Sequence, residues 1–215
     1  KSFGEYLTAR GMIRKLALMQ QQLFKHRDTP DIGWNEKECL KQWTILCGPT
    51  AMDDYLLSFL KDEIKLHPLE QVQQWQDMLC DLIGYTLHKG MPLEELAPRS
   101  TFLNEAKQSR DASEALLATL SSCAWITERI SIVDWPNLEA FGTWLMILQG
   151  QNDGNRVPLS SLCINYLNLD LCSLICQNLS NTWLQNSSLE KAFLSRAILD
   201  YSVLDWANLK GAVMD

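Results

Sequence analysis

The segment from Asn178 to Asp215 repeats a leucine at every fifth position, and this period limits the possible folds more than any other feature. A β-strand repeats every two residues and an α-helix about every 3.6 residues, so a strict period of five fits neither. Leucines five apart would rotate by about 140° around a helix and would cover all of its faces. The positions in this register are Leu179, Leu184, Leu189, Leu194, Leu199, Leu204 and Leu209.

A square coil satisfies this pattern. If each group of five residues forms one side, the leucine of each side points to the axis and stacks on the residue 20 positions away. The register extends back to Leu159 and forward to Met214. Residues two positions before each leucine are nearly all small, as Ala192, Ala197 and Ala207 are, which suits crowded inward corners. Coils spaced at about 4.8 Å would be joined by backbone hydrogen bonds, and about three coils are expected.

At these residues the sequence resembles the pentapeptide-repeat family, whose repeat is A-(D/N)-L-x-x. "ANLKG" (207–211) matches it fully, and "AFLSR", "AILDY" and "SVLDW" match its inward positions. The resemblance implies a right-handed quadrilateral β-helix over residues 157–215. Leu162, Leu167 and Gln177 occupy the small-residue position, so we expect an irregular first coil and an internal hydrogen-bond partner for Gln177.

The last repeat, "GAVMD", offers no cap for the apolar axis. Open solenoid ends expose apolar surface and an unpaired edge. We therefore expect either that the β-helix is truncated at its C-terminus or that two rods associate end to end through the last coil.

Residues 1–150 have helical rather than five-residue periodicity, and they predict an antiparallel α-helical bundle of unassigned family. The polar residues 151–156 predict a connector. We expect six tryptophans of this half to lie in its core: Trp34, Trp43, Trp75, Trp125, Trp135 and Trp144. Helical patterns cover residues 7–24, 35–43, 51–66, 68–90, 111–130 and 135–150.

The sequence contains no phosphate-binding, metalloprotease or nucleophile-elbow motif. It predicts no enzyme within this segment, and no catalytic residue, cofactor or metal site. The 7 cysteines include no CxxC pair, which favours reduced structural thiols and a cytoplasmic location. No apolar run is long enough to span a membrane. The basic residues within 1–27 suit a solvated helix face better than a site for nucleic acid or an anionic membrane, so we expect no nucleic-acid partner.

Adding 20 to each residue number gives the columns of the outer faces. On this basis Tyr166, Trp183, Val203 and Trp206 share one outer face, which predicts a contact surface. This face would dock either on the chain's own helical half or on a partner protein, and both alternatives are open.

We expect a non-catalytic protein–protein interaction or scaffold module. The resemblance admits a bacterial effector acting in host cytosol. An alternative is a substrate-recognition or regulatory segment of a larger enzyme, either an effector ubiquitin ligase or a signalling ATPase. A gyrase-binding DNA mimic is less favoured, because residues 157–215 hold five acidic and three basic side chains, a net charge of only −2.

Overall fold

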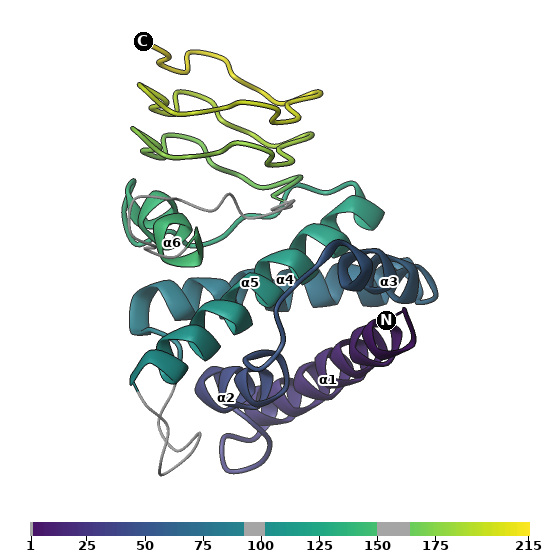
Figure 1. Ribbon diagram of the computed structural model, residues 1–215. Helices are drawn as coiled ribbons and strands as arrows, with labels where there is room; N and C mark the ends of the chain where they lie inside the picture. The colour runs from purple at the N-terminus through teal and green to yellow at the C-terminus, as the bar shows by residue number, and fades with distance from the viewer. Residues whose placement is uncertain (1, 93–101, 150–163) are drawn as a thin grey trace.

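A computed structural model describes residues 2–92, 102–149 and 164–215. Helices occupy the first two ranges, the helical region, and square coils occupy 164–215, the coil region (Figure 1). The predicted connector 151–156, together with Leu159, Leu162 and Cys163, lies outside the described residues. The helices are α1 (Ser2–Asp28), α2 (Glu36–Cys47), α3 (Asp54–Lys65), α4 (Leu69–Lys89), α5 (Phe102–Thr127) and α6 (Ala140–Gln149).

Capping side chains fix the starts of two helices. The side chain of Asn35 accepts a hydrogen bond from the Glu38 N–H at 2.9 Å and begins α2, as the sequence predicts. Asp53 accepts from the Leu56 N–H at 2.8 Å and begins α3. At the end of α4, Gly90 adopts a φ of 82°, which stops the helix without steric cost.

Four predicted helix starts differ from the structure: α1 begins at Ser2 rather than residue 7 and α3 at Asp54 rather than residue 51, and α5 and α6 also begin elsewhere. Helix α5 already begins at Phe102, well before residue 111. Helix α6 begins only at Ala140 rather than near Pro136, because the preceding backbone bonds to the coil region. There the Leu138 carbonyl accepts a hydrogen bond from the Ser173 N–H at 2.7 Å.

The hydrophobic core runs without interruption from the helices into the axis of the coils. Trp43, Trp75 and Trp144 are buried, as predicted, and the Trp43 Nε1 donates to the Ala112 carbonyl at 3.0 Å. Trp34 and Trp135 are only partly buried. The core prediction is wrong for Trp125, which is 37% exposed where α5 meets the coils.

A partly buried glutamate, Glu114, gives α5 a pH-dependent stability. Desolvation, with repulsion from Asp111, raises the pKa of Glu114 to about 7, although Arg110 opposes the rise. In the unfolded chain a glutamate titrates at about 4.3. The folded state therefore holds the Glu114 proton more tightly, and its stabilising contribution is full below about pH 4 and is lost as the pH rises to about 7.

We expect Glu114→Gln to raise the free energy of unfolding by about 2 kcal/mol at pH 8 and to leave it nearly unchanged at pH 4. Urea denaturation at both pH values measures this difference. Asp31→Asn, in an exposed turn, removes the same charge and serves as the control. An equal gain from both variants at pH 8 would trace the effect to net charge and would contradict the prediction.

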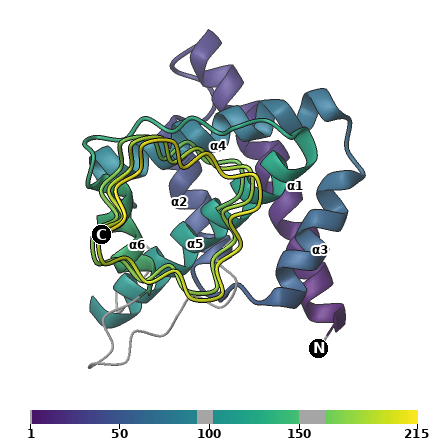
Figure 2. The ribbon, with the colours of Figure 1, turned by 90° about the horizontal axis from the view of Figure 1, so that it is seen from above.

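Successive coils stack in register every 20 residues, and their outline is square when viewed along the axis (Figure 2). Parallel single-residue bridges join Asn168 to Ser188, Ser173 to Phe193 and Trp183 to Val203. The predicted central residues are fully buried from Ile164 to Leu189, and they become partly exposed from Leu199 onward. The five-residue register is thus confirmed within the described residues from Ile164 on.

Each side of the coil ends in a tight turn. The N–H of the small residue donates to the carbonyl of the preceding central residue, as Thr182 does to Leu179 at 3.2 Å. The residue just before this donor has a positive φ, for example 59° at Asn181. The described coil residues form bridges of single residues and no longer strand, so the strands of a β-helix are not confirmed.

The first coil rests on a non-repeating layer formed by the α5–α6 connection and α6, here called the base layer (Ser131, Trp135, Leu138 and Gln149). Ser131 forms a parallel bridge with Leu167, and the Trp135 Nε1 donates to the Asn168 carbonyl at 3.0 Å. Gln149 donates to the Asn178 carbonyl. The base layer therefore supplies hydrogen-bond partners along several sides of the first coil (Figure 1).

The first coil tolerates the predicted irregular residues. Leu167 fits because it pairs with the base layer, and it is 1% exposed. The Oε1 atom of Gln177 is buried and makes no hydrogen bond with the described residues, so the expected partner is not found for this atom.

Candidate functional site

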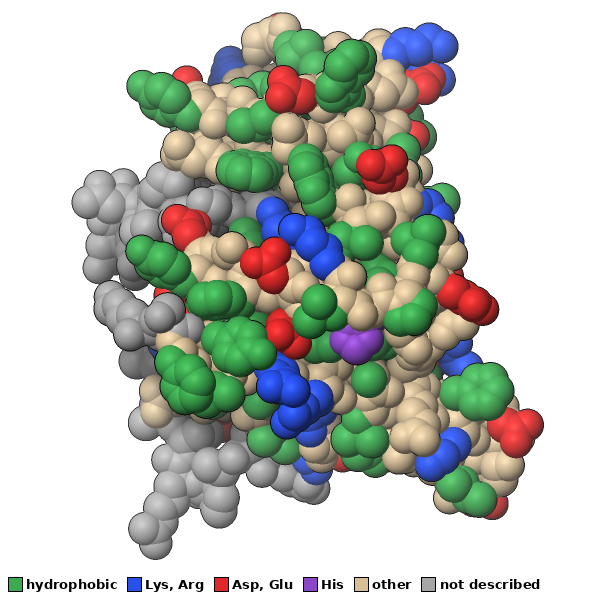
Figure 3. Space-filling model, turned by 90° about the vertical axis from the view of Figure 1, so that its right-hand side faces the viewer, with side chains coloured by type: hydrophobic (Ala, Val, Ile, Leu, Met, Phe, Trp, Pro, Cys, Tyr) green, Lys and Arg blue, Asp and Glu red, His purple; other side chains and the backbone are tan. Residues whose placement is uncertain are grey.

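The coil side that carries the predicted contact residues continues onto the helical region. Trp183 and Val203 are bridged directly, one above the other. The ring of Tyr166 meets that of Trp125 edge to face, with centroids 6.1 Å apart. Figure 3 shows this side of the molecule, where hydrophobic side chains gather over the coils and the adjoining helices.

We call this surface the aromatic face, and it consists of Trp125, Tyr166, Trp183, Tyr201, Val203 and Trp206. Tyr201 stands two residues before Val203, at the corner where this side of the last coil begins, and Trp206 stands at the corner where it ends. The structure thus brings together the four predicted residues and adds two. Tyr201 belongs to the preceding repeat, but its corner borders this side, and counting corners as well as columns would have found it.

A lysine of the helical region lies on the lower part of the aromatic face. The Lys61 ammonium, from α3, lies 5.8 Å from the ring centroid of Trp125 and 5.3 Å from that of Trp183. Both distances suit cation–π attraction, which is worth about 0.5–1 kcal/mol at exposed sites. Lys61 therefore links the helical region to the first coils, a role that the linear sequence does not indicate.

The upper part of the aromatic face, Tyr201, Val203 and Trp206, lies above these contacts. Tyr201 and Trp206 are each 88% exposed, whereas Trp183 is 39% exposed. The two parts therefore differ: the lower part packs against the helical region, and in the upper part Tyr201 and Trp206 are open to solvent while Val203 is partly buried.

The described corners of the coils all have a positive φ, at Leu171, Lys191 and Arg196 as well as at the two exposed aromatic residues, and this backbone suits few side chains. Tyr201 and Trp206 have φ values of 59° and 60°, in the left-handed region that costs most residues about 1–2 kcal/mol. One coil below, the same columns hold Asn181 and Asn186, and asparagine tolerates this conformation. The last coil thus replaces a well-suited residue by an exposed aromatic one at both corners.

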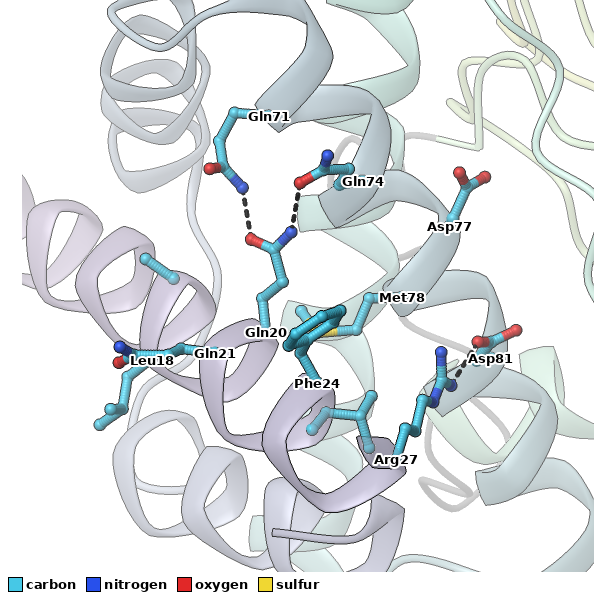
Figure 4. A pocket seen from close by; sticks show the side chains of 12 residues that line it. Leu18, Gln20, Gln21, Phe24, Arg27, Gln71, Gln74, Asp77, Met78 and Asp81 are labelled. Atoms are coloured by element: carbon cyan, nitrogen blue, oxygen red, sulfur yellow. Dashed lines mark hydrogen bonds and ion pairs between the residues drawn. The ribbon is translucent and has the colours of Figure 1, made fainter. Parts of the chain in front are cut away.

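A groove of about 810 Å³ lies elsewhere, between α1 and α4 (Figure 4). At one end the Gln20 side chain bonds to those of Gln71 and Gln74, and at the other Arg27 donates to Asp81 at 2.8 Å. Five of its polar side chains therefore bond to one another, Asp77 bonds to Arg129 outside the groove, and the apolar strip between them contains Phe24 and Met78. The groove is a weaker candidate than the aromatic face, because most of its polar side chains already have partners within the chain.

The described residues show no group of three or more His, Cys, Asp or Glu side chains that could hold a metal ion. Burial raises the pKa of the Cys39 and Cys80 thiols to about 12 and that of Cys172 to about 11. These thiols stay protonated at neutral pH and are poor nucleophiles. Within the described ranges, no helix has the length and apolar character needed to cross a bilayer.

Comparison with known families finds a match in the coil region. The model for pentapeptide repeats matches residues 178–215, in 8 copies. This segment is a run of pentapeptide repeats. The match begins where the small-residue positions become regular, after Gln177. No curated protein and no solved structure matches the chain.

Proposed function

We propose that this chain is a non-catalytic protein–protein interaction module, whose pentapeptide repeats present the upper part of the aromatic face to a partner protein. Pentapeptide repeats commonly serve as interaction modules. The observation that carries the proposal is the replacement of asparagine by exposed Tyr201 and Trp206 at two left-handed corners. The positive φ is common to all described corners, so what distinguishes these two is that large aromatic side chains stand there almost fully exposed, which is typical of contact surfaces.

The proposal divides the predicted contact residues between two roles. Tyr166 and Trp183 hold the coils against α5 and Lys61, which favours contact within the chain for the lower part. Val203 and Trp206, with Tyr201, face a partner. Exposed aromatic side chains of this kind supply most of the energy at many protein interfaces.

The proposal also includes the shape of the repeats, the cellular location and the flanking domains. The repeats would form the right-handed quadrilateral β-helix of the family that they resemble, with the helical domain in residues 1–150. The aromatic face would act in the cytoplasm, and in host cytosol if the protein is a bacterial effector. Attachment to a flanking ligase or ATPase domain, and end-to-end association through the last coil, stay predictions.

The experiment compares wild type with Tyr201→Asn/Trp206→Asn in affinity capture from cell lysate, read by mass spectrometry. We expect the double variant to lose a captured protein at least tenfold, because the aromatic contact area is gone. We also expect its free energy of unfolding to stay equal or to rise by up to about 1 kcal/mol, because asparagine suits the left-handed corners.

A matched control removes two exposed aromatic rings elsewhere. Phe3→Ala and Tyr55→Ala change side chains that are 73% and 63% exposed on the helical region. This control should keep the captured protein. Retention by Tyr201→Asn/Trp206→Asn, or equal loss from the control, would refute the proposed surface.

A further inference from the structure

The upper part of the aromatic face carries two matching pairs of side chains. Asp200 directly precedes Tyr201, and Asp205 directly precedes Trp206, so an exposed acidic residue and an exposed aromatic residue share each of these two corners of the last coil. The Asp205 carboxylate accepts from the Gln185 amide at 3.4 Å, a long contact that leaves it largely in solvent. An aromatic ring next to a carboxylate is a favourable site for a cationic side chain.

The lower part of the same face already holds such a cation. There Lys61 lies over both Trp125 and Trp183, and the carboxylate of Glu128 is close enough to Tyr166 to contribute, after burial, to raising the pKa of that phenol. The face therefore combines aromatic rings with acidic groups along its length. In the lower part the chain provides the cation itself, and in the upper part the described residues place none over Tyr201 or Trp206.

We propose that the upper part of the aromatic face binds a basic segment of a partner protein, with arginine side chains stacked on Tyr201 and Trp206 and paired with Asp200 and Asp205. This inference rests on the proposed function and names the chemistry of the partner. Arginine fits better than lysine, because its planar guanidinium stacks on a ring and pairs with a carboxylate at the same time. Nucleic acid and anionic membranes fit poorly, because the two carboxylates repel phosphate.

The probe is a 12-residue peptide with four arginines separated by glycine and serine, together with the same peptide carrying glutamate in place of arginine. Binding to the full chain is followed through the NMR signals of the tryptophan indole N–H groups, with the Trp206 signal assigned from Trp206→Asn. We expect the arginine peptide to shift the Trp206 signal and the glutamate peptide to leave it unchanged.

Charge variants separate a specific site from general attraction to an acidic protein. Asp200→Asn/Asp205→Asn should weaken arginine-peptide binding at least fivefold. Asp28→Asn/Asp31→Asn, which removes two exposed carboxylates from the helical region, should change it less than twofold. Equal weakening by both pairs, or an arginine peptide that leaves the Trp206 signal unmoved, would overturn the inference.

The captured protein from lysate distinguishes this inference from the function on which it rests. If Tyr201→Asn/Trp206→Asn loses that protein while Asp200→Asn/Asp205→Asn keeps it, the aromatic surface stands and the basic partner is refuted. If both double variants lose it, the surface and the partner chemistry are supported together.

Discussion

Leu184→Ala is expected to lower the free energy of unfolding by about 2–5 kcal/mol, whereas Leu204→Ala costs less than half as much. Leu184 is fully buried between the coils above and below it, so its truncation leaves a cavity that the stacked backbone cannot close. Leu204 lies on the same axis in the last coil and is partly exposed, so less apolar contact is lost there. Urea denaturation followed by circular dichroism measures both changes.

The comparison within one column is its own control, because the two substitutions have the same chemistry and differ only in their layer. A third variant, Leu171→Ala, changes a leucine that is 46% exposed on the outside of the coil, and we expect a change below about 1 kcal/mol. Similar losses at Leu184 and Leu204 would contradict the stacking of central residues along the axis.

Gly142→Ala is expected to destabilise the protein by about 1–3 kcal/mol, although alanine favours helices. A Cβ atom at Gly142 would lie 2.7 Å from the Ser173 carbonyl oxygen, so α6 could no longer pack directly on the first coil. Because that oxygen belongs to backbone, the clash is relieved only by moving the helix away from the coil. Thermal unfolding of wild type and variant measures the loss.

Gly11→Ala provides the matched control in α1. A Cβ atom there meets nothing within 4 Å, so we expect the ordinary gain of up to about 1 kcal/mol from replacing a helical glycine. Opposite signs for the two substitutions would identify close packing between α6 and the coil as the cause. A gain at both positions would show that α6 does not rest on the first coil.

The coil region was largely predictable from the sequence, because its fold depends on a local rule. Leu179 and its equivalents point inward for the same reason in every repeat, and the 20-residue spacing follows from four equal sides. Val203 and Trp206 could therefore be assigned to one surface by arithmetic. The small-residue rule failed at Leu167 and Gln177, where the neighbour is the base layer rather than another repeat.

The helical region was predictable only element by element. The capping residue Asn35 acts within one turn and was recognised from its neighbours in sequence, whereas the helix predicted from residue 51 missed the cap at Asp53. The position of Lys61 over Trp183 depends on how α3 packs beside the coils. The residues near Lys61 in the sequence do not predict this packing. For the same reason Trp125 was wrongly assigned to the core.

The base layer also bears on the order in which the chain can fold. A stack of identical coils has no preferred starting point of its own, because each coil needs a neighbour before its hydrogen bonds form. Ser131, Leu138 and Gln149 provide such a neighbour, and they precede the repeats in the chain. During synthesis from the N-terminus, the seed for the first coil is therefore made before the repeats emerge, so that each later coil can add to a finished one.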